Sequence, residues 1–292
     1  MKPSFRSAGA ISAAACAAIL ALTSCSSAST AASPNSAASK MTIQEGVLTL
    51  GTSLPDAPME YYEADGKTPT GVDIDLMTEV AKRLHLKLDI QSTAWDGLIP
   101  AAKANRYDIV AASIGDFKDR QKQLDFVDYL SVRSAVVVKA SDSGIADPLA
   151  LCGKSIGGTS GSVAITIAQR FSSDCEAAGK PAVKINEFPN GAAGLVALSS
   201  GRSDGQILDG PSAVYQAKTT EGGKAYKVAL GTVGPVAIYG VGLSKANTPL
   251  RDAISEQLNA MIKDGKYKEI LEKYGVQDYA IAQATVNAGG AK

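Results

Sequence analysis

Hydrophobic and polar positions along the chain follow two different periods in turn. Short runs of clustered or alternating apolar residues are typical of strands, and spacing by three or four residues is typical of helices. The strand patterns cover residues 46–51, 86–91, 108–111, 135–139, 154–158, 182–188, 206–208 and 237–243. The helix patterns lie near residues 76–84, 98–102, 164–171, 192–199, 250–262 and 267–274. This alternation of strands and helices predicts an α/β fold.

The first 24 residues have the pattern of a signal peptide. Lys2 and Arg6 precede an apolar stretch over residues 8–22 that is too short and too Ala-rich for a membrane span. The stretch runs into Leu-Thr-Ser-Cys at 22–25, which matches the bacterial lipobox. This resemblance implies cleavage before Cys25 and a diacylglycerol thioether on its sulfur. The alternative is an ordinary signal peptide with an incidental cysteine.

Residues 25–41 are predicted to form a flexible linker. The tract from Ser26 to Ser39 is rich in serine and alanine, so it cannot build a hydrophobic core. We therefore expect the folded body to be tethered by the Cys25 lipid to the extracytoplasmic face of the cell membrane.

Composition and charge exclude several classes of protein. Removing residues 1–24 leaves a formal net charge of −2, and no basic patch indicates a nucleic-acid partner. No later segment holds about 18 uninterrupted apolar residues, so the sequence offers no second membrane span. The remaining body is long enough for one large or two modest domains.

The four cysteines are expected to have three different fates. Cys16 belongs to the removed segment, and Cys25 is the lipid attachment site. Cys152 and Cys175 remain in an exported protein, where thiols oxidise, so we expect them to form a disulfide. Such a bridge would stabilise the fold by about 3 kcal/mol in the chain-entropy model. Two free thiols are the alternative.

Arg120 is the first candidate binding residue. It lies in a charged helical turn that follows the strand at 108–111 and a loop of small residues. A guanidinium holds a carboxylate with two parallel hydrogen bonds, a geometry that lysine cannot reproduce. Taken alone, such an arginine would be interpreted as a surface charge, so its role depends on the motifs around it.

Several short motifs occur in a fixed order along the body. They are Gly71-Val-Asp-Ile-Asp-Leu-Met77, Trp95-Asp-Gly-Leu-Ile-Pro100, Arg120 to Phe126, Leu151-Cys-Gly-Lys154, Gly201-Arg-Ser-Asp204 with Asp209, Asp264-Gly-Lys-Tyr267 and Lys273-Tyr-Gly275. Each is weak alone, but their order and spacing are specific. The body resembles the family 3 solute-binding proteins of polar amino-acid ABC transporters, as found in actinobacterial lipoproteins.

The resemblance implies an α/β fold of the type II periplasmic-binding-protein class. In this fold two α/β lobes are joined by two crossover strands, and the ligand lies in the cleft between them. Lobe 1 is expected to comprise residues 42–133 and 246–279, and lobe 2 residues 134–245. The Ala-rich residues 280–292 are predicted to form a loose C-terminal tail.

The resemblance also implies a set of ligand-binding residues. Arg120 aligns with the arginine that clamps the ligand α-carboxylate, and Asp209 with the acid that receives the α-ammonium. Ser113 falls in the loop that offers backbone groups, and Ser162 at a carboxylate-binding position near a helix N-terminus. Trp95 aligns with an aromatic residue that packs on the ligand. The alternatives are a capping role for Asp209 and Ser162 and a core role for Trp95.

Three residues depart from the family pattern. Gly115 stands where the family usually has serine or threonine, and Phe117 stands where the family often has threonine. Gly115 keeps the backbone N–H but lacks a hydroxyl, so either the carboxylate is held less tightly or the ligand is not a standard α-amino acid. Asp56 falls near an aromatic wall position and could receive a cationic or hydroxylated side chain; a solvated loop acid is the alternative. Glu60 is expected to serve the fold and not the ligand.

These observations predict a monomeric lipoprotein that captures a polar amino acid or close analogue and delivers it to an ABC permease. We expect no enzymatic activity, cofactor or metal. A periplasmic-type dehydratase or a ligand sensor on the same fold is the competing interpretation. His85 is the only histidine, which leaves almost no material for a histidine-based triad. Asp73 and Asp75 are expected to cap a helix or form a turn instead of binding a metal.

Overall fold

The computed structural model describes residue 38 and residues 40–290, and these residues form an α/β fold. The predicted signal peptide, the Cys25 lipid site and most of the linker lie outside the described residues. The strands are β1 (Val47–Thr52), β2 (Tyr61–Tyr62), β3 (Pro69–Thr70), β4 (Lys87–Ser92), β5 (Ile109–Val110), β6 (Leu124–Lys139), β7 (Ser155–Thr159), β8 (Lys184–Phe188), β9 (Gly205–Asp209) and β10 (Tyr226–Ser244).

Helices connect most of these strands. They are α2 (Val72–Arg83), α3 (Leu98–Lys103), α4 (Lys118–Gln121), α5 (Val163–Ala177), α6 (Gly191–Ser199), α7 (Gly210–Thr219), α8 (Thr248–Asp264) and α9 (Lys266–Lys273), with short 3-10 turns η1 (Trp95–Gly97), η2 (Pro148–Leu151), η3 (Thr220–Gly222) and η4 (Gln277–Tyr279). None of the helices in the described part of the chain is long and apolar enough to cross a bilayer.

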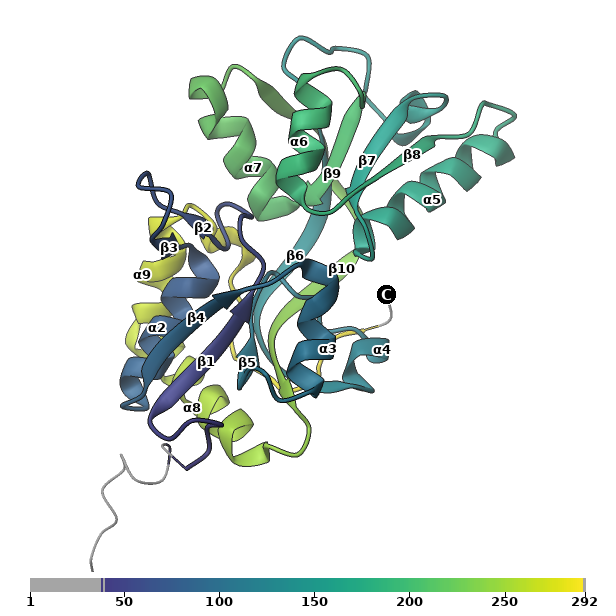
Figure 1. The fold of residues 1–292 in the computed structure, drawn as a ribbon. Helices are drawn as coiled ribbons and strands as arrows, with labels where there is room; N and C mark the ends of the chain where they lie inside the picture. The colour runs from purple at the N-terminus through teal and green to yellow at the C-terminus, as the bar shows by residue number, and fades with distance from the viewer. Residues whose placement is uncertain (1–37, 39, 291–292) are drawn as a thin grey trace, which may run out of the picture. The chain divides into compact units, whose positions relative to one another are not determined.

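The main sheet of the described residues has the strand order β4-β1-β5-β10-β6-β9-β7-β8 (Figure 1). At one end β1 pairs in parallel with β4 and β5, and at the other end β7 pairs in parallel with β8 and β9. The long strands β6 and β10 pair with each other in antiparallel fashion between these two groups. The chain therefore forms two α/β lobes joined by two crossover strands, as predicted.

The hydrophobic cores show where the chain crosses between the lobes. Val132 packs into the core of lobe 1 and Val136 into that of lobe 2, so the outward crossing lies between them. On the return, Val233 belongs to the lobe 2 core and Ala237 to the lobe 1 core. The return crossing therefore lies between Val233 and Ala237, which is earlier in the chain than the predicted boundary at residue 245.

Irregular pairing explains how one strand serves both lobes. The register of β10 against β6 shifts repeatedly between Val228 and Gly240. Such bulges bend a strand and increase its twist. The apolar pattern predicted only the last part of β10, at residues 237–243. The bulged part of β10 before it contains a mixture of buried and exposed residues and gives no clear pattern.

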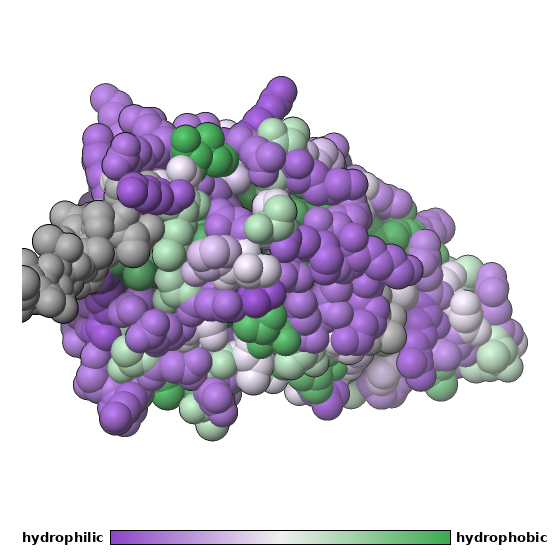
Figure 2. Space-filling model, turned by 90° about the horizontal axis from the view of Figure 1, so that it is seen from below, coloured by the Kyte–Doolittle hydropathy of each residue, from purple (hydrophilic) through white to green (hydrophobic). Residues whose placement is uncertain are grey.

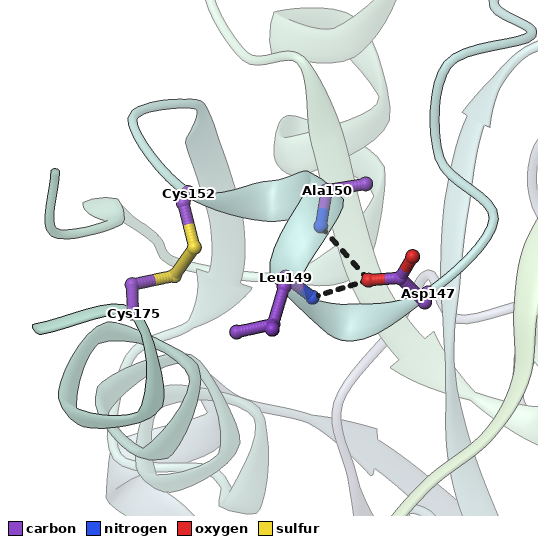
Figure 3. The surroundings of a disulfide bond; sticks show 5 residues. All are labelled: Asp147, Leu149, Ala150, Cys152 and Cys175. Atoms are coloured by element: carbon purple, nitrogen blue, oxygen red, sulfur yellow. Dashed lines mark hydrogen bonds between the residues drawn. A yellow bond between two sulfur atoms is a disulfide. The ribbon is translucent and has the colours of Figure 1, made fainter. Parts of the chain in front are cut away.

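The predicted disulfide is confirmed. Cys152, which follows η2, bridges Cys175 near the end of α5, with 5.5 Å between their Cα atoms (Figure 3). The Asp147 carboxylate caps η2 by accepting hydrogen bonds from the backbone N–H groups of Leu149 and Ala150. The bridge therefore joins a capped turn to the buried face of a helix in lobe 2.

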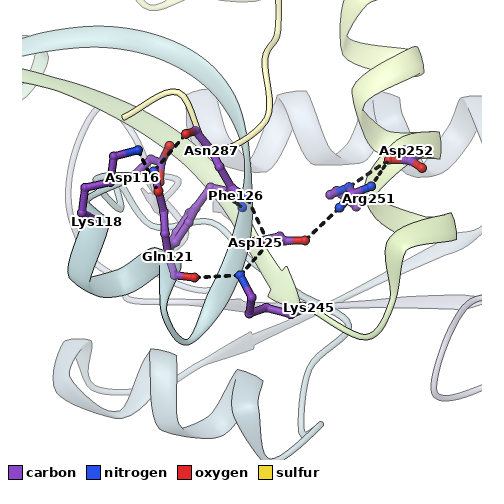
Figure 4. A network of polar contacts seen from close by, with 9 residues as sticks. All are labelled: Asp116, Lys118, Gln121, Asp125, Phe126, Lys245, Arg251, Asp252 and Asn287. Atoms are coloured by element: carbon purple, nitrogen blue, oxygen red, sulfur yellow. Dashed lines mark hydrogen bonds and ion pairs between the residues drawn. The ribbon is translucent and has the colours of Figure 1, made fainter. Parts of the chain in front are cut away.

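The C-terminal segment is held against lobe 1, contrary to the expected loose tail. Val286 bridges Val127 on β6, and the Asn287 side chain accepts a hydrogen bond from the Phe126 N–H at 2.8 Å (Figure 4). The Gly289 N–H donates to Asp116 at 2.7 Å. An Ala-rich composition concealed these specific polar contacts.

Exposed hydrophobic side chains are scattered on the face shown in Figure 2. Hydrophilic residues dominate this face, and hydrophobic residues occur between them in small separate groups. Scattered apolar side chains are normal for a protein surface and need no partner.

Candidate functional site

All seven predicted ligand-binding residues line one cavity between the lobes. The cavity encloses about 730 Å³ of space, including its opening to solvent. The predicted residues on its wall are Asp56, Trp95, Ser113, Gly115, Arg120, Ser162 and Asp209. The fold therefore brings together side chains that come from widely separated segments of both lobes.

Arg120 is held in a fixed orientation on helix α4. Its Nη1 donates a hydrogen bond to the Gly115 carbonyl at 3.0 Å. The guanidinium lies over the ring of Trp95 at 5.4 Å and over that of Phe117 at 5.3 Å, within the range of cation–π attraction. Burial lowers the pKa of Arg120, but an arginine remains charged in proteins. Its other N–H donors can therefore hold an anionic ligand group.

Gly115 and Phe117 are two parts of one arrangement. A Cβ atom added to Gly115 would lie only 2.4 Å from the Phe117 ring. Phe117 is only 3% exposed and also supports the Arg120 guanidinium. Phe117 therefore fills the space that a side chain at position 115 would need, which explains why both residues depart from the family pattern.

Asp209 lines the same cavity as Arg120, has the opposite charge when ionised, and comes from lobe 2. It ends strand β9 and precedes helix α7, yet its side chain makes no capping hydrogen bond. Burial raises the pKa of Asp209, while the Tyr239 hydroxyl and Arg120 act to lower it. Because the helix does not use this carboxylate as a cap, it is free to accept hydrogen bonds from a ligand ammonium.

The backbone N–H of Ser113 is already hydrogen-bonded to another residue of the protein. This N–H donates to the Asp73 carboxylate at 2.8 Å, and the Tyr129 hydroxyl donates to the same side chain at 2.7 Å. Asp73 therefore ties the Ser113 loop to strand β6, and the expected capping role was wrong for this residue. The Ser113 hydroxyl donates to Glu60 Oε2 at 3.4 Å, so for a ligand Ser113 offers its carbonyl and the lone pairs of its hydroxyl.

Ser162 has the predicted capping role and also lies on the cavity wall. It caps helix α5, since its Oγ accepts a hydrogen bond from the Ala164 N–H at 3.2 Å. The same hydroxyl donates to the Thr159 carbonyl at 2.7 Å. Ser162 thus presents the positive end of a 15-residue helix to the cavity, where an anionic ligand group is favoured.

Asp56 and Glu60 form an acidic pair on the cavity wall. The two residues face each other in an isolated antiparallel bridge, and both line the cavity. Burial and neighbouring Asp209 raise the pKa of Asp56 to about 8. Burial and neighbouring Asp73 raise the pKa of Glu60 well above its ordinary value. Glu60 lines the cavity and is also hydrogen-bonded to Asp73 and lies 3.4 Å from Ser113 Oγ, so it supports the loops around the cavity.

Tyr239 and Ser212 also line the cavity, and the sequence did not predict either of them as a site residue. Tyr239 is 2% exposed and its hydroxyl makes no hydrogen bond of regular geometry with the described residues, although it lies near enough to Asp209 to affect its pKa. Ser212 lies in the first turn of α7, and its hydroxyl reaches Asp56 at 3.4 Å. Tyr239 belongs to a strand buried on both faces, so periodicity could not show which way its ring points.

Metal binding finds no support among the side chains at the site. No group of three or more potential ligands from histidine, cysteine, aspartate and glutamate occurs in the described part of the chain. Asp75 instead pairs with Lys273 at 2.6 Å and accepts a hydrogen bond from the Tyr274 hydroxyl.

The fold and the two-sided cavity are those of a solute-binding protein. Residues 48–277 match the family of bacterial extracellular solute-binding proteins, family 3, and the chain belongs to this family. The family is named for extracellular solute binding, and the curated relatives described next are named as amino-acid-binding proteins.

Curated relatives match most of the chain. The L-cystine-binding protein TcyA of Bacillus subtilis is 31% identical over 80% of this chain and 83% of its own length. The arginine-binding protein ArgT of Corynebacterium glutamicum is 27% identical over 84% of this chain and 79% of its own length.

Solved structures show the same fold. An ancestral arginine-binding protein bound to arginine is 32% identical, with a TM-score of 0.69 over 78% of this chain and 98% of its own. An ancestral arginine-binding protein bound to glutamine is 30% identical, with a TM-score of 0.70 over 79% of this chain and 98% of its own.

Proposed function

We propose that this protein is a monomeric lipoprotein that captures a polar α-amino acid between its lobes and delivers it to an ABC permease. Arg120 would hold the α-carboxylate, together with the N-terminus of helix α5 at Ser162. Asp209 would receive the α-ammonium. The Trp95 ring, over which the Arg120 guanidinium lies, would help to orient that guanidinium. The Ser113 hydroxyl and the Gly115 backbone complete the wall around the ligand.

The observation that carries this proposal is the placement of Arg120 and Asp209 on one cavity. A zwitterion needs one fixed cation and one fixed anion, and the two lobes supply one each. Each charge would be costly to bury without a partner, so a ligand that pairs with both groups stabilises the closed arrangement. Relatives that are named for binding cystine, arginine and histidine support an amino-acid ligand.

Calorimetric titration against a panel of L-amino acids tests the binding role. We expect Arg120→Gln and Asp209→Asn each to weaken binding of the best ligand by at least about 100-fold, because each removes one partner of a desolvated charge. Asp278→Asn is the matched control, since this exposed acid lies away from the cavity. If both cavity variants keep affinity within a few-fold of wild type, the assignment of these residues is wrong.

The lipid anchor has its own test. Cys25→Ser should release the protein from the membrane fraction into the medium and remove the lipid mass from the mature chain. Cys16→Ser is the control, because Cys16 lies within the segment that we expect to be removed. Retention of a lipidated Cys25→Ser protein in the membrane would contradict the proposed anchor.

A further inference from the structure

We propose that residues 285–289 of the C-terminal segment are a positioning element of the binding site, which holds the loop and helix that carry Arg120 in the orientation that a ligand carboxylate needs. This inference rests on the proposed function, because it assumes that Arg120 holds this carboxylate. It adds residues that do not touch the ligand and act through Arg120. They follow the part of the chain that matches the family, which ends at residue 277.

The positioning element is anchored to strand β6. The Thr285 hydroxyl donates to the carboxylate of the buried Asp128 at 2.8 Å, and the Ala288 N–H donates to the same carboxylate at 3.1 Å. The Asp128 N–H in turn donates to the Thr285 carbonyl at 2.8 Å. The Phe126 N–H donates to the Asn287 side chain at 2.8 Å. Because both strand residues lie in the interior of lobe 1, these hydrogen bonds give the element a fixed position relative to the sheet.

The element also holds Asp116, the neighbour of Gly115 in the loop before helix α4. The Gly289 N–H donates to Asp116 Oδ2 at 2.7 Å, and Asp116 is fully buried. The same loop is tied to β10, because the Asp116 N–H donates to the Ile238 carbonyl at 2.7 Å. Gly115 provides the carbonyl that accepts the hydrogen bond from Arg120 Nη1. Both β10 and the positioning element therefore fix the backbone that orients Arg120.

Gln121 extends this support to helix α4, where it directly follows Arg120. Its side-chain amide lies beside Asp116 and Asn287 (Figure 4) and donates to Asp116 Oδ1 at 2.8 Å and to the Asn287 carbonyl at 3.1 Å. It also reaches the Gly289 carbonyl at 3.2 Å. A displacement of the element would therefore move both the loop that orients the guanidinium and the helix that carries it.

Support of the backbone affects affinity because a binding group works best when it is in place before the ligand arrives. A group that is already fixed in its bound orientation loses little conformational freedom on binding. Binding groups need neighbours that hold them to within about 0.5 Å of the productive position. The rings of Trp95 and Phe117 hold the Arg120 guanidinium itself, and the positioning element holds the backbone on which this side chain is mounted.

Two single substitutions disturb the element in different ways, and each has a matched control. In Gly289→Ala the added Cβ would collide with the Asp116 backbone carbonyl. Gly290→Ala is its control, because a Cβ there would have no neighbour within 4 Å among the described residues and the Gly290 carbonyl stays in place. Gln121→Glu keeps the shape of the side chain but replaces its N–H donors with acceptors that face other acceptors. Gln123→Glu adds the same charge at an exposed position of the same loop.

Calorimetric titration with the best-binding amino acid from the panel and with its carboxamide, which lacks the carboxylate, measures the effect. We expect the wild-type protein to prefer the acid by at least about 100-fold. Gly289→Ala and Gln121→Glu should each weaken binding of the acid by at least about tenfold and leave binding of the carboxamide within about threefold. The two controls should keep the wild-type preference. Partial unfolding of a variant would reduce binding of both ligands equally, so it would not change this preference.

A double-mutant cycle with Arg120→Gln shows whether the element acts through Arg120. In that background Gly289→Ala and Gln121→Glu should each weaken binding of the acid by less than about threefold. An unchanged preference for the acid in both single variants, or an equal loss for both ligands, would overturn this inference and leave the proposed function intact. A further tenfold loss in the Arg120→Gln background would do the same. A wild-type protein that binds acid and carboxamide equally would overturn the proposed role of Arg120, and this inference with it.

Discussion

At the scale of single residues, the orientation of Arg120, which we propose holds the ligand carboxylate, depends on aromatic support. In this chain two rings and one backbone carbonyl hold the Arg120 guanidinium, and no side-chain hydroxyl is present at position 115. Phe117 both fills the space above Gly115 and contacts the guanidinium. Packing against these two rings and the Gly115 carbonyl therefore fixes the orientation of the Arg120 guanidinium.

Gly115→Ser should weaken amino-acid binding, although it restores the residue type usual in the family. Its Cβ would collide with the Phe117 ring and displace the support of Arg120. We expect a loss of at least about tenfold in calorimetric affinity, comparable to an overpacked core site. The double variant Gly115→Ser/Phe117→Thr should recover part of this loss, and a double variant as weak as the single one would refute the coupling.

Sequence motifs predicted several residues that line the cavity, because these residues lie at characteristic positions after strands. Arg120, Asp209 and Ser162 each follow a strand whose pattern was recognisable. The positions of Glu60 and Tyr239 on the cavity wall could not be predicted from the sequence, for physical reasons. The approach of Glu60 to Asp56 depends on a short irregular bridge, and the orientation of Tyr239 depends on a bulged strand that is buried on both faces.

At the scale of elements, the C-terminal segment acts as an additional strap on lobe 1. It pairs with the start of β6 and contacts Asp116 and Gln121, which flank the loop and helix that carry Arg120 (Figure 4). Composition alone predicted a loose tail, because alanine and glycine give no periodic signal. The few polar residues among them make the contacts that hold the segment in place.

Asn287→Ala should lower the free energy of unfolding by about 1–3 kcal/mol, because it leaves the Phe126 N–H without its acceptor. Asn287 also has a φ of 55°, a conformation that asparagine tolerates better than alanine. Urea denaturation followed by circular dichroism measures the change. Gln283→Ala is the control on the same segment, since Gln283 is exposed. Equal stability of the two variants would show that the strap contributes little.

At the scale of the whole molecule, both lobes contribute residues to the cavity that we propose holds the ligand, and β6 and β10 connect the lobes. Lobe 1 supplies Arg120 and Asp56, while lobe 2 supplies Asp209 and the start of helix α5. The fold class, the two lobes and the disulfide could all be predicted from motif order and cysteine count. The return crossing could not be placed, because bulges hide the continuous length of β10.

Ligand binding should stabilise the whole molecule by mass action. At a concentration 100 times the dissociation constant, a ligand that binds only the folded state adds about 2.7 kcal/mol of stability. For a body of this size we expect a rise in Tm of roughly 5–11 °C. Thermal unfolding with increasing concentrations of the best-binding amino acid from the titration panel measures this shift. The shift should disappear in Arg120→Gln, and an equal shift in that variant would place the ligand elsewhere.

The most direct test of the central claim is a crystal structure of the protein with the best-binding amino acid from the titration panel. We expect the α-carboxylate to pair with Arg120 and the α-ammonium with Asp209. A ligand bound outside this cavity, or inside it with its α-carboxylate away from Arg120, would contradict the account.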